Sequence, residues 1–300
     1  MLSRKCTGRG YRCGTTLVEL LVVLVILAMV GGTIMRVAVG QQRFLGAVEQ
    51  LMQMERAVRE GADIPRGELR GAVLESGGIY EMAPNRVEFR APVGSAVLCA
   101  VDSSRTTVVI PDRRSWSALS SWIASPRLGD TILVFDAAID SAPPGWRIHT
   151  LANELTAGGR CEVTTGLAPT SSDESAALTF RLTPPLEPDI EAGAPVRFFR
   201  RARYELYRAS DSRWYLGFLD CAPARAVPCG TIQPVSGPFE ADGVRFSYSD
   251  STGAPATDPA RVARIDVLSR AATNAPLRAM GFALGFHSDS VLASIALRNR

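Results

Sequence analysis

The chain has 300 residues, with 33 basic and 30 acidic side chains and a formal net charge of +3. Its apolar content of 46% excludes a wholly disordered protein, and the near balance of charge argues against a nucleic-acid binder that relies on electrostatics. Only two histidines are present, which excludes a histidine-rich metal site. The length suits one large domain or two small ones.

The first 14 residues form a basic leader. They contain Arg4, Lys5, Arg9 and Arg12 and no acidic residue. Residues 15–300 then hold 29 basic and 30 acidic side chains, a net charge of −1. The positive net charge of the chain therefore belongs to its leader alone.

An apolar segment over residues 15–35 follows the leader, and Glu19 is its one acidic residue. A helix of about 20 apolar residues crosses the hydrocarbon layer of a membrane. Because the basic residues precede this segment, the positive-inside rule places the leader in the cytoplasm and the rest of the chain in the periplasm. An ordinary cleaved signal or a plain signal anchor would explain the apolar residues, but neither explains Glu19.

The residues from Gly14 to Glu19 (GTTLVE) resemble the signature of type IV prepilins, which pilins share with the pseudopilins of type II secretion. The resemblance implies that prepilin peptidase cuts between Gly14 and Thr15 and that the new N-terminus is methylated. Glu19 then falls at the fifth mature position, where the family's acid pairs with the N-terminal amine of a neighbouring subunit. The family usually has Phe or Met where Thr15 stands, which puts methylation in doubt.

Physical chemistry supports a partner for Glu19. A carboxylate inside a bilayer costs on the order of 2.5–3.5 kcal/mol on insertion scales. Removal of the leader would create an α-amino group at Thr15, about one helical turn from Glu19. The alternative is that Glu19 only reaches back to the membrane interface.

The helical pattern is expected to continue beyond the membrane over residues 36–62. An apolar stripe that includes Phe44, Leu45, Met52 and Val58 predicts an amphipathic helix that packs on a globular domain. Gly61 and Pro65 predict its end. The alternative is two helices that are separated at Gly31 and Gly32.

Residues 66–300 are predicted to form a β-rich periplasmic head. Alternating apolar and polar residues, separated by turn-forming residues, indicate a largely antiparallel sheet, and a short helix is expected over 116–124. The expected strands are 86–90, 106–110, 131–135, 147–151, 177–182, 196–200, 203–208, 213–219, 244–248, 261–268 and 291–297. The predicted fold class is α+β and pilin-like, with one long N-terminal helix packed on this head.

The head resembles minor pilins of the PilW type and the large J-type pseudopilins. The similarity lies in the strand pair 203–208 and 213–219, the segment 243–248 (GVRFSY), the strand at 261–268 and the ending 296–300 (ALRNR). It implies a minor subunit that primes a filament or caps its tip. The implied partners are other pilin or pseudopilin subunits, prepilin peptidase and the inner-membrane assembly platform.

Four cysteines remain after the leader, which carries the other two. They are Cys99, Cys161, Cys221 and Cys229, and three pairings are open to them in a compartment that permits disulfides. The short loop between Cys221 and Cys229 favours that pair and leaves Cys99 with Cys161. The four cysteines show no CxxC spacing and have no histidine nearby in the sequence, so nothing indicates a metal site.

No nucleotide-binding, metalloprotease or serine-hydrolase motif occurs, so no catalytic residue, cofactor or metal is predicted. Asp242, Asp250 and Asp258 are too widely spaced for a compact calcium cage and indicate turns. The stretch 197–201 (RFFRR) could contact DNA, but a mature net charge of −1 favours a strand with a solvated arginine face. The predicted function is a structural pilin or pseudopilin subunit; the alternative is a membrane-anchored periplasmic module that binds DNA or an exported protein.

Overall fold

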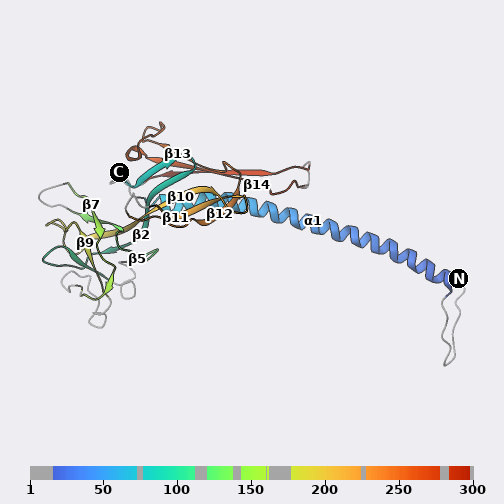
Figure 1. Ribbon diagram of the computed structural model, residues 1–300, viewed down its shortest axis with the longest axis horizontal. Coiled ribbons are helices and arrows are strands. Elements are labelled where there is room, and N and C mark those ends of the chain that lie inside the picture. The colour runs from blue at the N-terminus through green and yellow to red at the C-terminus, as the bar shows by residue number, and fades with distance from the viewer. Residues whose placement is uncertain are drawn as a thin grey trace, which may run out of the picture. The chain divides into compact units, whose positions relative to one another are not determined.

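The computed structural model describes residues 16–72, 77–111, 120–137, 143–159, 161, 177–223, 228–277 and 284–297 (Figure 1). The described residues form two compact units. One unit comprises the chain as far as Gln53 together with Thr273–Phe286, and the other comprises Met54–Ala272 and His287–Arg300. The fold is α+β, with one long N-terminal apolar helix and a largely antiparallel sheet head.

Helix α1 (Leu17–Leu69) has 53 residues and is roughly 80 Å long at 1.5 Å per residue. It runs without a break through Gly31 and Gly32, so the alternative of two helices is wrong. It also continues past Gly61 and Pro65, where the sequence predicted its end. Both residues are buried against the head, and this tertiary packing outweighs their low helix propensity.

In the first unit, α1 presents apolar side chains to its surroundings. Every large apolar side chain from Leu17 to Val37 is at least 50% exposed. The segment Thr273–Phe286 belongs to the same unit, and the backbone N–H of Ala275 donates to Gln50 Oε1 at 3.2 Å. The N-terminal part of the helix therefore has an apolar surface without a protein core around it.

In the second unit, α1 packs on the head through a buried stripe of mostly small residues. The stripe recurs at helical spacing and consists of Ala57, Val58, Gly61, Ala62, Pro65 and Leu69. Phe44, Leu45 and Met52 were predicted to pack on the head, but they remain 58%, 64% and 66% exposed. The predicted packing is confirmed for Val58 and is wrong for the other three, because the prediction followed large side chains, whereas small ones let the helix lie close to a sheet.

All recorded strand pairings in the head are antiparallel. The first strands are β1 (Ile79–Ala83), β2 (Arg86–Val97), β3 (Ala100–Val101), β4 (Thr107–Pro111), β5 (Ser121–Trp122), β6 (Thr131–Asp136), β7 (Gly145–Leu151) and β8 (Thr156–Ala157). The later ones are β9 (Ala177–Thr183), β10 (Pro195–Arg208), β11 (Trp214–Asp220), β12 (Gln233–Phe239), β13 (Val244–Ser249), β14 (Arg264–Ala272) and β15 (Ser288–Ala296).

The larger sheet has the strand order β1-β2-β10-β6-β7-β9-β4-β3. Strand β10 lies beside β2 over almost its whole length, with β6 on the other side of its first half and β11 beside its second half. Strand β12 pairs with β11, β5 with β2, and β8 with β9. The long strands β2 and β10 connect the strands β1, β11 and β12 with the strands β6, β7 and β9 of this sheet (Figure 1).

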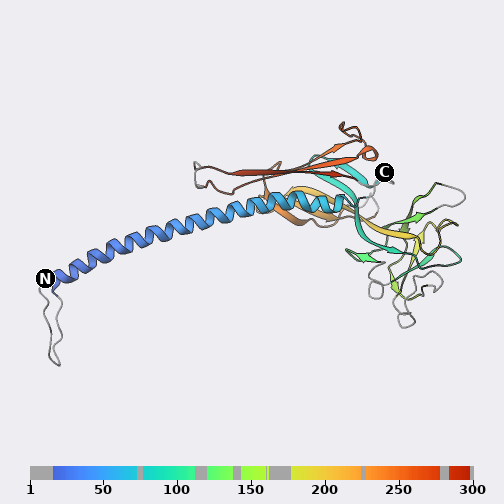
Figure 2. The ribbon, with the colours of Figure 1, turned by 180° about the vertical axis from the view of Figure 1, so that it is seen from behind.

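The head has two main hydrophobic clusters. The first joins the buried stripe of α1 to the β1-β2-β10-β11 region and to a separate sheet of order β13-β14-β15. The second lies among β2, β4, β6, β7, β9 and β10, with Phe180 and Phe198 packed edge to face. Figure 2 shows the three-stranded sheet beside the final turns of α1.

The structure contains a strand at every position where the sequence predicted one, but several bounds differ, and β2 continues to Val97, well beyond the predicted end at 90. The strands predicted at 196–200 and 203–208 are a single strand, β10, and the strand predicted from 261 begins at Arg264. Strands β1, β3, β5, β8 and β12 were not predicted. The helix expected over 116–124 is wrong where the structure describes it, because Ser121–Trp122 form β5; residues 112–119 lie outside the described residues.

The first prediction concerns the close approach at Gly61. A Cβ atom there would lie 2.6 Å from Ser269 Oγ and 2.7 Å from Phe239 Cζ. We therefore expect Gly61→Ala to lower the free energy of unfolding by about 1–3 kcal/mol, as overpacking usually does. Denaturant unfolding of the purified chain measures this change.

The control for this prediction is Gly67→Ala, in the same helix. A Cβ at Gly67 would meet nothing within 4 Å. Its substitution should raise stability by up to about 1 kcal/mol, because alanine is the better helix former. Equal effects of the two substitutions would contradict the packing argument.

Candidate functional site: the apolar helix and a charge cluster beside a disulfide

The start of α1 is capped by Thr16. Its hydroxyl accepts a hydrogen bond from the backbone N–H of Glu19 at 3.3 Å, and its carbonyl accepts one from the N–H of Leu20 at 3.1 Å. Thr16 is thus the N-cap, and Glu19 is the third residue of the helix, where a carboxylate interacts favourably with the helix dipole. The predicted cleavage residues Gly14 and Thr15 lie outside the described residues.

Helix α1 is long and apolar enough to cross a membrane. The most apolar window of 18 residues has a mean hydropathy of 2.7, and none of it is buried. Among the described residues it is the one helix with these properties. Its length and exposure agree with a span near the N-terminus, and the sequence places the basic leader directly before it.

Both disulfides lie in the head. Cys99 is bonded to Cys161, 62 residues away, and Cys221 is bonded to Cys229, eight residues away. These are the two pairs that the short loop between Cys221 and Cys229 favours. Disulfides persist in oxidising compartments, so they suggest that the head lies in the periplasm.

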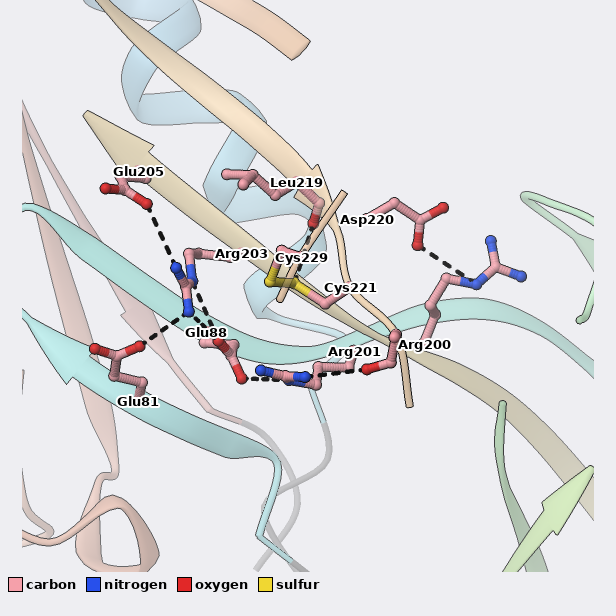
Figure 3. The surroundings of a disulfide bond; sticks show 11 residues. Glu81, Glu88, Arg200, Arg201, Arg203, Glu205, Leu219, Asp220, Cys221 and Cys229 are labelled. Carbon is pink, nitrogen blue, oxygen red and sulfur yellow. Dashed lines mark hydrogen bonds and ion pairs between the residues drawn. A yellow bond between two sulfur atoms is a disulfide. The ribbon is translucent and has the colours of Figure 1, made fainter. Parts of the chain in front are cut away.

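A charge cluster lies beside the second disulfide (Figure 3). Glu88 of β2 accepts hydrogen bonds from Arg201 Nε with one carboxylate oxygen and from Arg203 Nη2, at 2.7 Å, with the other. Glu88 and Arg203 are directly opposite in the β2–β10 register. The side chains of Glu88 and Arg201 are only 3% and 8% exposed, so the pair is withdrawn from water.

The cluster extends to neighbouring elements. Arg203 also forms ion pairs with Glu81 of β1, at 3.2 Å, and with Glu205, at 3.6 Å. Arg201 Nη1 donates to the carbonyl of Ala222, next to the disulfide, at 3.1 Å. The cluster therefore ties β1, β2 and β10 to the chain at Cys221.

The ionised form of Glu88 is favoured in the folded state. Burial alone would raise the pKa of Glu88, but the hydrogen bonds and positive charges of Arg201 and Arg203 outweigh it and hold this pKa below its ordinary value of 4.5. An acid whose pKa is lower in the folded state than in the unfolded chain stabilises the fold at pH values above its unfolded pKa. This stabilisation is lost as the pH falls through the folded pKa.

Glu88, Cys221 and Cys229 come close enough to suggest a metal site, since their ligand atoms lie within 4.8 Å of one another. Their chemistry argues against it. Both sulfur atoms are bonded to each other, and the carboxylate is already engaged by two guanidinium groups. Those positive charges oppose a bound cation, so this arrangement acts as a structural brace.

The basic and aromatic stretch 197–201 has little charge to offer a nucleic acid. Arg200 pairs with Asp130 at 2.7 Å, and Arg201 pairs with Glu88, in both cases with a nearly buried carboxylate. Arg197 lies over the ring of Trp146 at 4.5 Å from its centroid. The acids that neutralise this stretch are far away in the sequence.

Three other polar residues, His149, Asp250 and Asp258, have structural partners. His149 is fully buried, with Nδ1 2.9 Å from the carbonyl oxygen of Pro184. Asp250 accepts hydrogen bonds from Thr252 and from the N–H of Ala254, as a turn residue does. Asp258 caps the short 3₁₀ helix Pro259–Arg261.

The chain was compared with family models, curated proteins and solved structures. No family model, no curated protein and no solved structure matches the chain.

The second prediction tests the buried charge cluster. Glu88→Gln would leave Arg201 and Arg203 without their shared carboxylate, so we expect the free energy of unfolding at neutral pH to fall by about 3–5 kcal/mol. As the pH falls below about 4.5, the difference from the unsubstituted protein should shrink, because the unfolded chain then binds a proton at Glu88 that the folded protein takes up only at a lower pH. Denaturant unfolding across the pH range measures both effects.

Glu55→Gln is the control, because Glu55 pairs with Arg59 on an exposed face of α1. Such pairs contribute at most about 1 kcal/mol. A loss at Glu88 no larger than the loss at Glu55, or a difference that stays constant down to acid pH, would contradict the assigned role of Glu88.

Proposed function

We propose that this chain is a minor subunit of a type IV pilus or of a type II secretion pseudopilus. Its leader is removed by prepilin peptidase, its apolar helix anchors it in the bacterial inner membrane, and its head lies in the periplasm until it is assembled into a filament or at its tip. Its role is structural and not enzymatic. Other pilin or pseudopilin subunits and the inner-membrane assembly platform are its proposed partners.

One observation carries this proposal: an acidic residue stands at the beginning of an otherwise apolar, exposed helix, five residues after a glycine that ends a basic leader. A membrane anchor alone needs no acid at Glu19. The capping contact of Thr16 occupies the backbone N–H of Glu19 and not its carboxylate. That carboxylate is therefore available to pair with the N-terminal amine of a neighbouring subunit.

A second candidate function is a membrane-anchored module that binds an exported protein. It is favoured by a hollow of about 580 Å³ in the head, lined by Trp122, Leu155 and Leu178 among other residues. N-terminal sequencing of the chain from membranes separates the two functions. A chain that begins at Thr15 supports the filament subunit, and one that begins at Met1 supports the anchored module.

The third prediction concerns processing. Gly14→Val should leave a full-length precursor, because a branched side chain would stand directly before the bond to be cut. Intact-mass measurement of the protein from membranes that contain prepilin peptidase gives the result. Gly10→Val, four residues earlier in the leader, should be processed normally. Removal of the leader from the Gly14 variant would contradict the proposal.

The fourth prediction separates the charge of Glu19 from its place in the helix. Glu19→Gln keeps a side chain of similar size but removes the charge, so the protein should insert in the membrane and enter filaments at least about tenfold less often, the effect of losing about 1.4 kcal/mol of pairing. Thr16→Ala removes the cap but leaves the charge, and it should be incorporated nearly normally. Quantitative immunoblots of sheared filaments and of membranes measure both.

If Glu19→Gln were incorporated as well as the unsubstituted protein, pairing with an N-terminal amine would be wrong. If Thr16→Ala were as defective as Glu19→Gln, the cap and not the charge would control assembly.

A further inference from the structure

Strand β15 is an edge strand with a long, regular free side. It pairs with β14 through nine consecutive residue pairs, from Arg264↔Ala296 to Ala272↔Ser288, without a bulge. Among the described residues, no other strand pairs with it and no backbone hydrogen bond reaches its outer side. Such an edge exposes a row of N–H and C=O groups that can pair with another chain.

The opposite edge of the same sheet is closed. On β13, the N–H of Phe246 donates to the carbonyl of Pro84 at 2.8 Å. The carbonyl of Tyr248 accepts from the N–H of Ala256 at 3.0 Å. The outermost strand β12 of the larger sheet is protected differently, since it contains two prolines and its register with β11 shifts twice.

The side chains of β15 do not protect its edge either. Proteins commonly place charges or prolines on edge strands to prevent pairing, but β15 contains no proline, and its one charged residue, Asp289, lies at its start. Ala293 and Ile295 face the core, whereas Ser290, Leu292 and Ser294 are exposed, and Leu292 is 63% exposed. The strand is therefore firmly held on one face and uncharged on the other.

We propose that the free edge of β15 binds an extended segment of another polypeptide, which adds to the β13-β14-β15 sheet as a fourth strand. Main-chain hydrogen bonds would supply the affinity, and an uncharged aliphatic residue next to Leu292 would supply the specificity. A charged residue at that place would lose solvation beside Leu292, and the neighbouring exposed residues Ser290 and Ser294 would offer it no opposite charge.

The partner is a different chain and not a second copy. Strand β15 runs in the same direction as the part of α1 within this unit, Met54–Leu69 (Figures 1 and 2). Antiparallel pairing of two β15 edges about a twofold axis would point the two helices in opposite directions. Two chains anchored in one membrane by their N-terminal helices cannot adopt that arrangement. The inference needs an anchored chain, but it does not need a filament.

Amide hydrogen exchange of the full chain tests the proposal. The probe is the protein in its native membranes, compared with the same protein solubilised as a monomer in detergent. Because strand addition would pair the outer amides of β15, we expect their exchange in membranes to slow by about tenfold or more, with no change in β13. Equal exchange of β15 in the two states would overturn the proposal.

Lysine substitutions give a matched comparison. Ser290→Lys with Ser294→Lys places charges along the open edge, and Ser247→Lys places one on the exposed face of β13, whose edge is closed. The first variant should lose the protection of β15 with its melting temperature unchanged, and the second should keep it. Protection that survives the β15 lysines would overturn the proposal.

A cross-link from a photoreactive residue at Leu292 identifies the type of partner. A product with twice the mass of the chain would indicate a second copy and contradict the assignment to a different polypeptide. Protection of β15 that persists in the unprocessed Gly14→Val variant would show that this edge works independently of filament assembly, so the two proposals can fail separately.

Discussion

The head depends on the pairing of β2 with β10. Eleven residue pairs join the two strands, and the strands contribute to both hydrophobic clusters, with Phe89 and Tyr204 in one and Val93 and Phe198 in the other. Because neighbouring residues of a strand face opposite sides, a slip of one residue would move buried side chains to the surface in both clusters at once. The buried contacts of Glu88 with Arg201 and Arg203 cross this same pair of strands and fix its register.

The sequence predicted the elements whose pattern is local. The apolar helix follows from composition and length, and most strands follow from alternation. Strand β10 was divided in two because its centre carries consecutive arginines, and the sequence pattern cannot show that Asp130 and Glu88 neutralise them from 70 and 113 residues away. Strand β12 was missed because its glycine and prolines read as a turn, although its place beside β11 tolerates them.

The same reason explains which parts of the candidate site could be predicted. Glu19 and the cysteine pairs depend on short spacings, which a sequence displays. The cluster at Glu88 depends on contacts between distant strands, and the one local signal is an acidic residue between the buried Val87 and Phe89. The end of α1 was misplaced because Gly61 and Pro65 end an isolated helix, whereas here the sheets hold them in place.

Arginine, rather than lysine, supplies the positive charges in the ion pairs of the head. Lys5 is the one lysine of the chain, and it lies in the leader. A guanidinium group can donate in several directions within one plane, so Arg203 contacts Glu81 and Glu88 together, and Arg200 holds both oxygens of Asp130. A single ammonium group could not reproduce these paired contacts.

The two parts of α1 are subject to different tolerances. The large apolar side chains from Leu20 to Met35 are exposed and have no protein core of this chain around them, so substitutions among Leu, Ile, Val and Met should be tolerated there. Ala57, Gly61 and Ala62 lie against the head, where volume matters and one additional methyl group is too large. One continuous helix thus carries two kinds of information: hydrophobicity alone in its first part, and shape in its last turns.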